Sequence, residues 1–160
     1  MAAVEVERKW LVADSEAIPA QALAAPAATI EQGYLTLAAD GGETRVRRRD
    51  GSFTLTVKSG RGMVRGEAEI ELSAQQFERL WPATEGARVQ KRRHAIPLPD
   101  GLLIELDIYA GTLCGLIVAE VEFTDASAAE RFVAPAWFTR EVTDDDAYKN
   151  RSLATGGRPA

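Results

Sequence analysis

The feature that most constrains this chain is a set of short segments in which charged and apolar residues alternate. Residues 4–12, Val-Glu-Val-Glu-Arg-Lys-Trp-Leu-Val, place Glu5, Glu7 and Lys9 on one face and mostly apolar side chains on the other. Because successive side chains of a β-strand point to opposite faces, this segment is predicted to be a strand with one apolar face. What the chain can build therefore depends on whether its charged faces point outward or toward one another.

The same period-two pattern recurs along the chain and predicts a sheet. Further strands are expected at residues 29–37, 43–49, 53–58, 64–72, 89–98, 102–109 and 117–123. Asp50-Gly51 and Pro99-Asp100-Gly101 are turn signals between neighbouring strands, which predicts antiparallel hairpins. The chain is therefore expected to contain seven or eight mostly antiparallel strands.

Helix signals are fewer and local. Ser73 with Gln76 forms a capping box at the start of a helix that Pro82 ends. Asp125 is the expected N-cap of a helix that runs to about Phe132. Residues 14–25 predict a short helix or a loop, and residues 144–153 predict a last short helix. The combination is an α+β pattern in which the sheet dominates.

Length and composition fit one domain, predicted to span residues 1–155 with a flexible tail at residues 156–160. The single Cys114 and the single His94 exclude an internal disulfide framework and a histidine-based metal cluster. A net charge of −5 argues against a general nucleic-acid or anionic-membrane partner. No apolar run approaches the roughly 20 residues that cross a bilayer, and no secretory signal is evident, so a cytoplasmic location is expected.

The charged faces carry blocks of a single sign, and two architectures remain open for them. The blocks are Glu5 and Glu7; Arg45, Arg47 and Arg49; Glu67, Glu69 and Glu71, which follow Arg65 on the same face; Lys91 and Arg93; Glu105 and Asp107; and Glu120 and Glu122. An open antiparallel sheet with a solvated polar face is the commoner arrangement. Like charges about 7 Å apart along a strand repel, however, and the amphipathic helices need an apolar surface to cover. A barrel with a charged lumen and a helix-covered exterior satisfies both conditions.

A charged lumen has to be hydrated and has to hold counter-ions, because unpaired buried charge is too costly. Clustered carboxylates without a nearby His or Cys suit a hard cation such as Mg²⁺ or Mn²⁺. Clustered Arg and Lys suit a polyanion with many phosphate oxygens. The two sets together suggest a phosphate chain that is held by protein cations and bridged by metal.

The order of these residues resembles that of a known family. Glu5-Val6-Glu7-Arg8-Lys9 resembles the ExExK signature of the CYTH superfamily, also called triphosphate tunnel metalloenzymes. The resemblance covers nearly the whole chain through Gln32-Gly33-Tyr34-Leu35, Arg45-x-Arg47, Thr56-Val57-Lys58-Ser59, Arg65-x-Glu67-x-Glu69, Lys91-x-Arg93, Glu105-Leu106-Asp107, Glu120-Val121-Glu122-Phe123, Trp137-Phe138, Glu141-Val142-Thr143 and Tyr148-Lys149-Asn150. The chain is most similar to the short bacterial members that act as inorganic triphosphatases. This resemblance implies an eight-stranded antiparallel β-barrel, or tunnel, that binds a triphosphate.

The resemblance also implies roles for individual residues. The implied metal ligands are Glu5, Glu7, Glu120 and Glu122, with Glu69 and Asp107 binding directly or through water. The implied phosphate contacts are Lys9, Arg45, Arg47, Lys58, Arg65, Lys91 and Arg93, with Lys149 reaching in from a C-terminal plug helix. Glu67 is expected to pair with a basic neighbour. The residues implied to be catalytic are Glu5, Glu7, Lys9, Lys91, Glu120 and Glu122.

The implied reaction is hydrolysis of inorganic triphosphate (tripolyphosphate) to pyrophosphate and phosphate by a water that Mg²⁺ or Mn²⁺ activates. Nucleoside or thiamine triphosphate remain alternative substrates, and a non-catalytic polyphosphate-binding module remains an alternative function. The expected partner is a triphosphate-containing small molecule, and the protein is expected to be a monomer or homodimer that binds neither nucleic acid nor membrane. The residues expected to lie outside the site are His94, Cys114, the capping run Asp144–Asp146, and the barrel-covering Trp81, Trp137 and Phe138.

Overall fold

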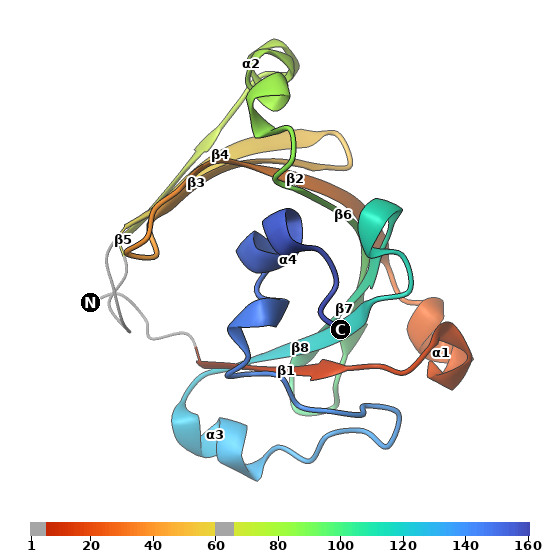
Figure 1. Ribbon diagram of the computed structural model, residues 1–160. Coiled ribbons are helices and arrows are strands. Elements are labelled where there is room, and N and C mark those ends of the chain that lie inside the picture. Colours follow the sequence, from red (N-terminus) through yellow and green to blue (C-terminus); the bar gives the residue numbers. More distant parts are fainter. Residues whose placement is uncertain (1–5, 60–65) are drawn as a thin grey trace.

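A single curled antiparallel sheet dominates the computed structural model, which describes residues 6–59 and 66–160. Its strands are β1 (Val6–Leu11), β2 (Ala27–Leu37), β3 (Glu43–Arg49), β4 (Ser52–Ser59), β5 (Gly66–Glu71), β6 (Arg88–Pro97), β7 (Leu103–Tyr109) and β8 (Ile117–Phe123). They pair in the order β1-β8-β7-β6-β2-β3-β4-β5. Figure 1 shows the sheet curving into an incomplete ring. Within the described residues no strand pairing joins β1 to β5, so the predicted eight-stranded fold is confirmed as a tunnel-like curled sheet that hydrogen bonds do not close.

Short helices connect and cover the strands. They are η1 (Ser15–Ala17), α1 (Ala20–Leu23), α2 (Ala74–Leu80), η2 (Trp81–Thr84), η3 (Gly111–Leu113), α3 (Ala126–Arg131), η4 (Asp146–Tyr148) and α4 (Asn150–Gly156). Both predicted caps are present: the Ser73 hydroxyl accepts from the backbone N–H of Gln76, and the Asp125 carboxylate accepts from that of Ala128. The α1, α2 and α3 helices lie on the convex side of the sheet, whereas α4 lies on its concave side (Figure 1).

The last helix differs from its predicted bounds. Residues 144–153 were expected to form one short helix, but extended backbone at Lys149 (φ −69°, ψ 141°) divides this stretch into η4 and α4. The α4 helix also continues to Gly156, so the predicted tail begins one residue later than expected. Asp145 caps η4 by accepting a hydrogen bond from the backbone N–H of Ala147, in line with the capping role expected for this acidic run.

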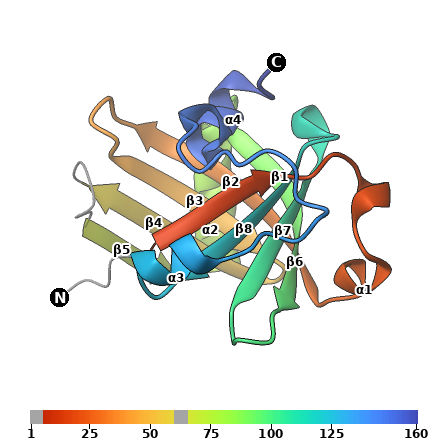
Figure 2. The ribbon, with the colours of Figure 1, turned by 90° about the horizontal axis from the view of Figure 1, so that it is seen from below.

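An apolar core lies between the convex face of the sheet and its cover. Trp10, Leu106 and Val121 are buried members of this core. Trp10 packs its ring against Phe132 and Phe138, with ring centroids 5.6 and 5.2 Å apart. The prediction that Phe138 covers the barrel is therefore confirmed. Figure 2 shows α3 lying beside β1 on this side of the molecule.

A second apolar cluster fills one end of the concave side. Its buried members are Val89, Tyr109, Leu113, Leu116, Val118, Val142, Tyr148 and Leu153. Leu153 of α4 packs into this cluster, and the Tyr109 hydroxyl donates a 2.7 Å hydrogen bond to the side chain of Asn150. Arg151 ties the same helix to the opposite wall through a 3.0 Å hydrogen bond to the carbonyl of Ala38. The α4 helix therefore fills one end of the curled sheet.

The segment that leads into α4 lies along the free edge of β1. The N–H of Leu11 donates to the carbonyl of Arg140, and the N–H of Val142 donates to that of Lys9, both at 2.8 Å. The Arg8 guanidinium binds both carboxylate oxygens of Glu141 at 2.7 Å. Residues 139–143 thus cover an edge that a fully closed barrel would pair with another strand.

Gly33 allows β2 to approach η2 closely. A Cβ at this position would lie 2.4–2.8 Å from the Oγ1, Cβ and Cγ2 atoms of Thr84, which is closer than van der Waals contact allows. Thr84 is fully buried, and its hydroxyl is fixed by a 2.7 Å bond to the carbonyl of Trp81 and a 2.8 Å bond from Arg88. The Thr84 side chain therefore has little freedom to move aside.

We expect Gly33→Ala to lower the free energy of unfolding by about 1–3 kcal/mol, because the added methyl overpacks a rigid contact. Gly51→Ala is the matched control, since Gly51 has open space around its Cα and no positive φ. Urea denaturation of both variants measures the difference. Equal stabilities for the two variants would contradict the close approach described here.

Candidate functional site

Strand register places the charged blocks on the concave face of the sheet. Glu7 lies opposite Glu122, and Lys9 lies opposite Glu120, where β1 pairs with β8. On the other side of β8, Glu120 lies opposite Glu105 of β7. Side chains that are cross-strand neighbours stand on the same face and within reach of each other. The alternation read from the sequence therefore brings acidic and basic groups from distant segments onto one concave face of the sheet, called the hollow below.

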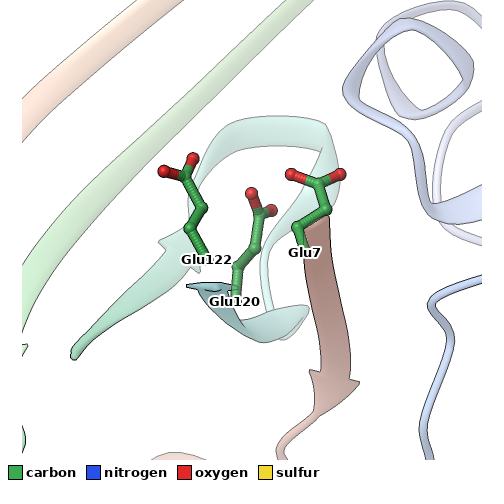
Figure 3. A group of neighbouring side chains, drawn as sticks. All are labelled: Glu7, Glu120 and Glu122. Atoms are coloured by element: carbon green, nitrogen blue, oxygen red, sulfur yellow. The ribbon is translucent and has the colours of Figure 1, made fainter. Parts of the chain in front are cut away.

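Three carboxylates form a cluster at the junction of β1 and β8. Glu7, Glu120 and Glu122 each offer an oxygen, and these oxygens lie within 4.8 Å of one another. Figure 3 shows the three side chains pointing to the same side of the two strands. Although Glu7 as a whole remains accessible to solvent, partial burial of its carboxyl and then the charge of Glu120 raise the pKa of Glu7 to about 7.

Lys9 supplies a positive charge beside this cluster. Its ammonium lies 3.4 Å from a carboxylate oxygen of Glu120. Burial alone would raise the pKa of Glu120, but the charge of Lys9, a hydrogen bond from Glu7 and the charge of Arg93 together outweigh it, so this pKa lies below its usual value. Glu120 is thus the ionised member of the pair, whereas the ionised form of Glu7 is disfavoured. A hard divalent cation bound among the three oxygens would relieve the repulsion that Glu7 experiences.

Asp107 is a buried counter-ion for two basic residues of β6. One of its oxygens accepts from the Lys91 ammonium at 2.6 Å, and both accept from the Arg93 guanidinium at 2.7 and 2.8 Å. Burial alone would raise the pKa of Asp107, but Lys91 and Arg93 lower it to about 2. Burial lowers the pKa of Lys91 to about 8; the attraction of Asp107 opposes this shift, and the charge of Arg93 adds to it.

Two arginines of β3, Arg45 and Arg47, have less compensation. Arg47 makes no ion pair within the described residues, and burial, followed by repulsion from Arg45 and Arg93, lowers its pKa to about 10. Arg45 approaches Glu43 at 3.4 Å, but its buried Nε has no hydrogen-bond partner among the described residues. Because buried donors are rarely left unpaired, this arrangement is typical of a site that an anion completes.

The edge strands contribute further groups. Glu69 accepts a 2.9 Å hydrogen bond from the Thr56 hydroxyl, and the Glu67 carboxylate lies 3.3 Å from the Lys58 ammonium. The prediction that Glu67 pairs with a basic neighbour is therefore confirmed. Glu69 and Asp107 do not belong to the carboxylate cluster of the described residues, so their binding to metal stays a prediction.

Three predicted site residues stand apart from these contacts. Glu5 and Arg65 lie outside the described residues. Lys149 is exposed and pairs with Asp146 at 2.6 Å, immediately before α4. Its reach toward a bound substrate therefore stays a prediction.

The structure also adds groups to the hollow that the charge pattern did not single out. Gln32 is fully buried and accepts a 2.8 Å hydrogen bond from Arg47. Thr56, on β4, is nearly fully buried and donates to Glu69. Both residues lie in motifs of the resemblance, but a search for charged faces passes over neutral side chains. His94 is buried near the carbonyl of Ala25, at 3.3 Å, on the opposite strand face from Arg93.

The relatives and the solved structure that resemble this chain carry the same name. No protein-family model matches the chain. A relative from Nitrosomonas europaea named inorganic triphosphatase is 48% identical over 155 residues, which are 94% of this chain and 96% of the relative. An inorganic triphosphatase from Acetivibrio thermocellus is 32% identical over 93% of this chain and 92% of its own length. A crystal structure of an inorganic triphosphatase has a TM-score of 0.74 and 45% identity, covering 94% of both chains.

The lowered pKa of Asp107 predicts a specific acid dependence of stability. The unfolded chain takes up this proton near the ordinary pKa of 3.8 and the folded chain only near 2, so Asp107 contributes stability that is complete above about pH 4 and lost as the pH falls to about 2. We expect Asp107→Asn to cost about 2 kcal/mol near neutral pH and progressively less across this window. Urea unfolding of both proteins from pH 2 to pH 7 tests this, and a pH-independent difference would contradict the assignment.

Proposed function

The chain belongs to the inorganic triphosphatases of the CYTH superfamily, the triphosphate tunnel metalloenzymes, and we propose that it hydrolyses inorganic triphosphate to pyrophosphate and phosphate with Mg²⁺ or Mn²⁺. The observation that carries the proposal is the separation of charge within one hollow. A carboxylate cluster on β1 and β8 shares the concave face with incompletely compensated arginines on β3. A metal-bound triphosphate complements both sets at once.

The residues present fit a divalent metal. Three carboxylates within 4.8 Å of one another provide the hard oxygen ligands that Mg²⁺ and Mn²⁺ prefer, and the raised pKa of Glu7 reports unrelieved crowding there. We propose Glu7, Glu120 and Glu122 as ligands, together with Glu5. When bound, the metal would neutralise phosphate oxygens and increase the acidity of water.

The basic residues would bind and orient the phosphate chain. Arg45, Arg47, Lys91 and Arg93 come from two strands, and Lys9 adds a charge next to the carboxylates. Asp107 would keep Lys91 and Arg93 in place. Phosphoryl transfer depends mostly on positioning and charge neutralisation, so a fixed cationic wall is the main contribution that the protein itself makes. The proposed outer phosphate contacts are Lys58, Arg65 and Lys149.

The relatives named above favour inorganic triphosphate over nucleoside or thiamine triphosphate as the substrate. The complete acidic cluster disfavours a non-catalytic polyphosphate-binding module, because carboxylates facing an anion weaken its binding unless metal lies between them. Among the described residues, no helix has the length and apolar character required to span a membrane.

Removal of metal tests the proposed reaction. We expect phosphate release from tripolyphosphate to stop in EDTA and to return on addition of excess Mg²⁺ or Mn²⁺. Glu120→Gln should lower kcat by about 100-fold or more, because it removes a charged ligand. Glu130→Gln on α3 is a control with the same chemical change at an exposed position. Hydrolysis that persists in EDTA would exclude the metal-dependent reaction.

Two neighbouring arginines on opposite faces of β3 test the cationic wall. Arg47 lies on the concave face, whereas Arg48 lies on the convex face and pairs with Glu31. We expect Arg47→Gln to reduce kcat/KM for tripolyphosphate by about 10² or more, because a charge-assisted contact to phosphate is lost. Arg48→Gln should change kcat/KM less than about twofold. Steady-state kinetics would disprove the assigned face if both variants behaved alike.

A further inference from the structure

A buried chain of neutral groups lies behind the cationic wall. The side-chain carbonyl of Gln32 accepts a 2.8 Å hydrogen bond from Nε of Arg47. The side-chain amide of Gln32 donates a 2.8 Å hydrogen bond to the hydroxyl of Tyr34. Gln32 has no exposed surface and Tyr34 only 3%, so bulk water does not replace these contacts. The oxygen and the nitrogen of the Gln32 amide therefore each have a hydrogen-bond partner, which fixes the orientation of the amide.

The strand register pairs each neutral group with an arginine. Gln32 lies directly opposite Arg47, and Tyr34 lies directly opposite Arg45, where β2 pairs with β3. Burial, followed by the charge of Glu43, raises the pKa of Tyr34 to about 12, so its hydroxyl stays neutral at physiological pH. A buried position next to two arginines is one where a carboxylate would be the more obvious partner.

The wall on β6 makes this contrast explicit. There, Arg93 is held by the carboxylates of both Asp107 and Glu105, which compensate its charge. Arg47 is held at its Nε by an amide, which fixes the direction of the guanidinium but supplies no negative charge. The remaining N–H donors of Arg47 stay available to an anion, because the amide does not neutralise the guanidinium.

We infer that Gln32 is a positioning residue that orients Arg47 through a neutral acceptor and so leaves the charge of Arg47 available to substrate phosphate. The inference rests on the proposed function and goes beyond it, because it assigns a role to an uncharged residue that acts through Arg47. It also explains why glutamine suits this position. A glutamate would fit the same space and accept the same hydrogen bond, with the Tyr34 hydroxyl turning to donate to it.

The test separates orientation from charge by means of Gln32→Glu. This variant preserves the shape and the acceptor for Arg47 but adds a carboxylate that competes with phosphate. Binding of tripolyphosphate is measured by calorimetry in metal-free buffer containing EDTA, at several salt concentrations. We expect at least a tenfold weaker affinity than wild type and a shallower dependence of affinity on salt, because one cation of the wall is neutralised. The thermal midpoint should stay equal to that of wild type or rise.

Gln76→Glu is the matched control, because glutamate replaces glutamine in the capping box of α2 without loss of the cap. It adds the same charge outside the hollow and should leave affinity within about twofold of wild type. Gln32→Met is the second variant, to be used also if Gln32→Glu does not fold. It keeps the charge of Arg47 but removes its acceptor, so affinity should fall less than in Gln32→Glu and the salt dependence should match wild type.

The outcomes distinguish this inference from the proposed function. Wild-type binding with an unchanged affinity in Gln32→Glu would overturn the role of Gln32 alone. Equal affinity and salt dependence in Gln32→Met and wild type would overturn it as well if Gln32→Glu does not fold. A wild-type protein that binds no tripolyphosphate, either in EDTA or with Mg²⁺, would overturn both the anion site and the role of Gln32. A wild-type protein that binds tripolyphosphate and never hydrolyses it with any metal would leave the role of Gln32 intact and remove the proposed reaction.

Discussion

Mutual compensation between charges that share a concave surface is the constraint on which the rest of this structure depends. Removing a charged group from water is tolerated only when an opposite charge or a bound ion takes the place of solvent. Asp107 meets this condition completely, with Lys91 and Arg93 around it. Glu7 and Arg47 do not meet it: the pKa of Glu7 is raised and that of Arg47 is lowered, and both shifts favour the neutral form of the side chain. The uncompensated charge is negative near Glu7 and positive near Arg47, and a metal ion bound to a phosphate chain would compensate both.

The placement of apolar surface follows from the same constraint. Because the concave face carries charge, the main core lies on the convex face, where α1, α3 and the segment near Phe138 cover it. The second cluster, around Val118 and Leu153, is the exception: it closes one end of the concave side. The charged residues of the concave face therefore lie beside an apolar end of the same face.

Sequence predicted the features that depend on local pattern. The bounds of β3 and β8 were obtained exactly, because alternation continues to the ends of both strands, and the caps at Ser73 and Asp125 are local hydrogen bonds. The pairing of residues 139–143 with β1 was not predicted, since it depends on contacts between segments more than 120 residues apart, such as Arg8 with Glu141 (133 residues). The proposed role of Gln32 was not predicted either, because it depends on the arginine that lies opposite in the neighbouring strand.

The contact between β1 and the segment that precedes α4 has a consequence for synthesis of the protein. During translation the first strand emerges early, but its edge is covered only after residues 139–143 follow, and the hollow is filled at one end only after Leu153. Contacts between such distant segments form late and slow the folding of a chain. A nascent chain shorter than this therefore exposes the edge of β1 without the segment that covers it in the folded protein.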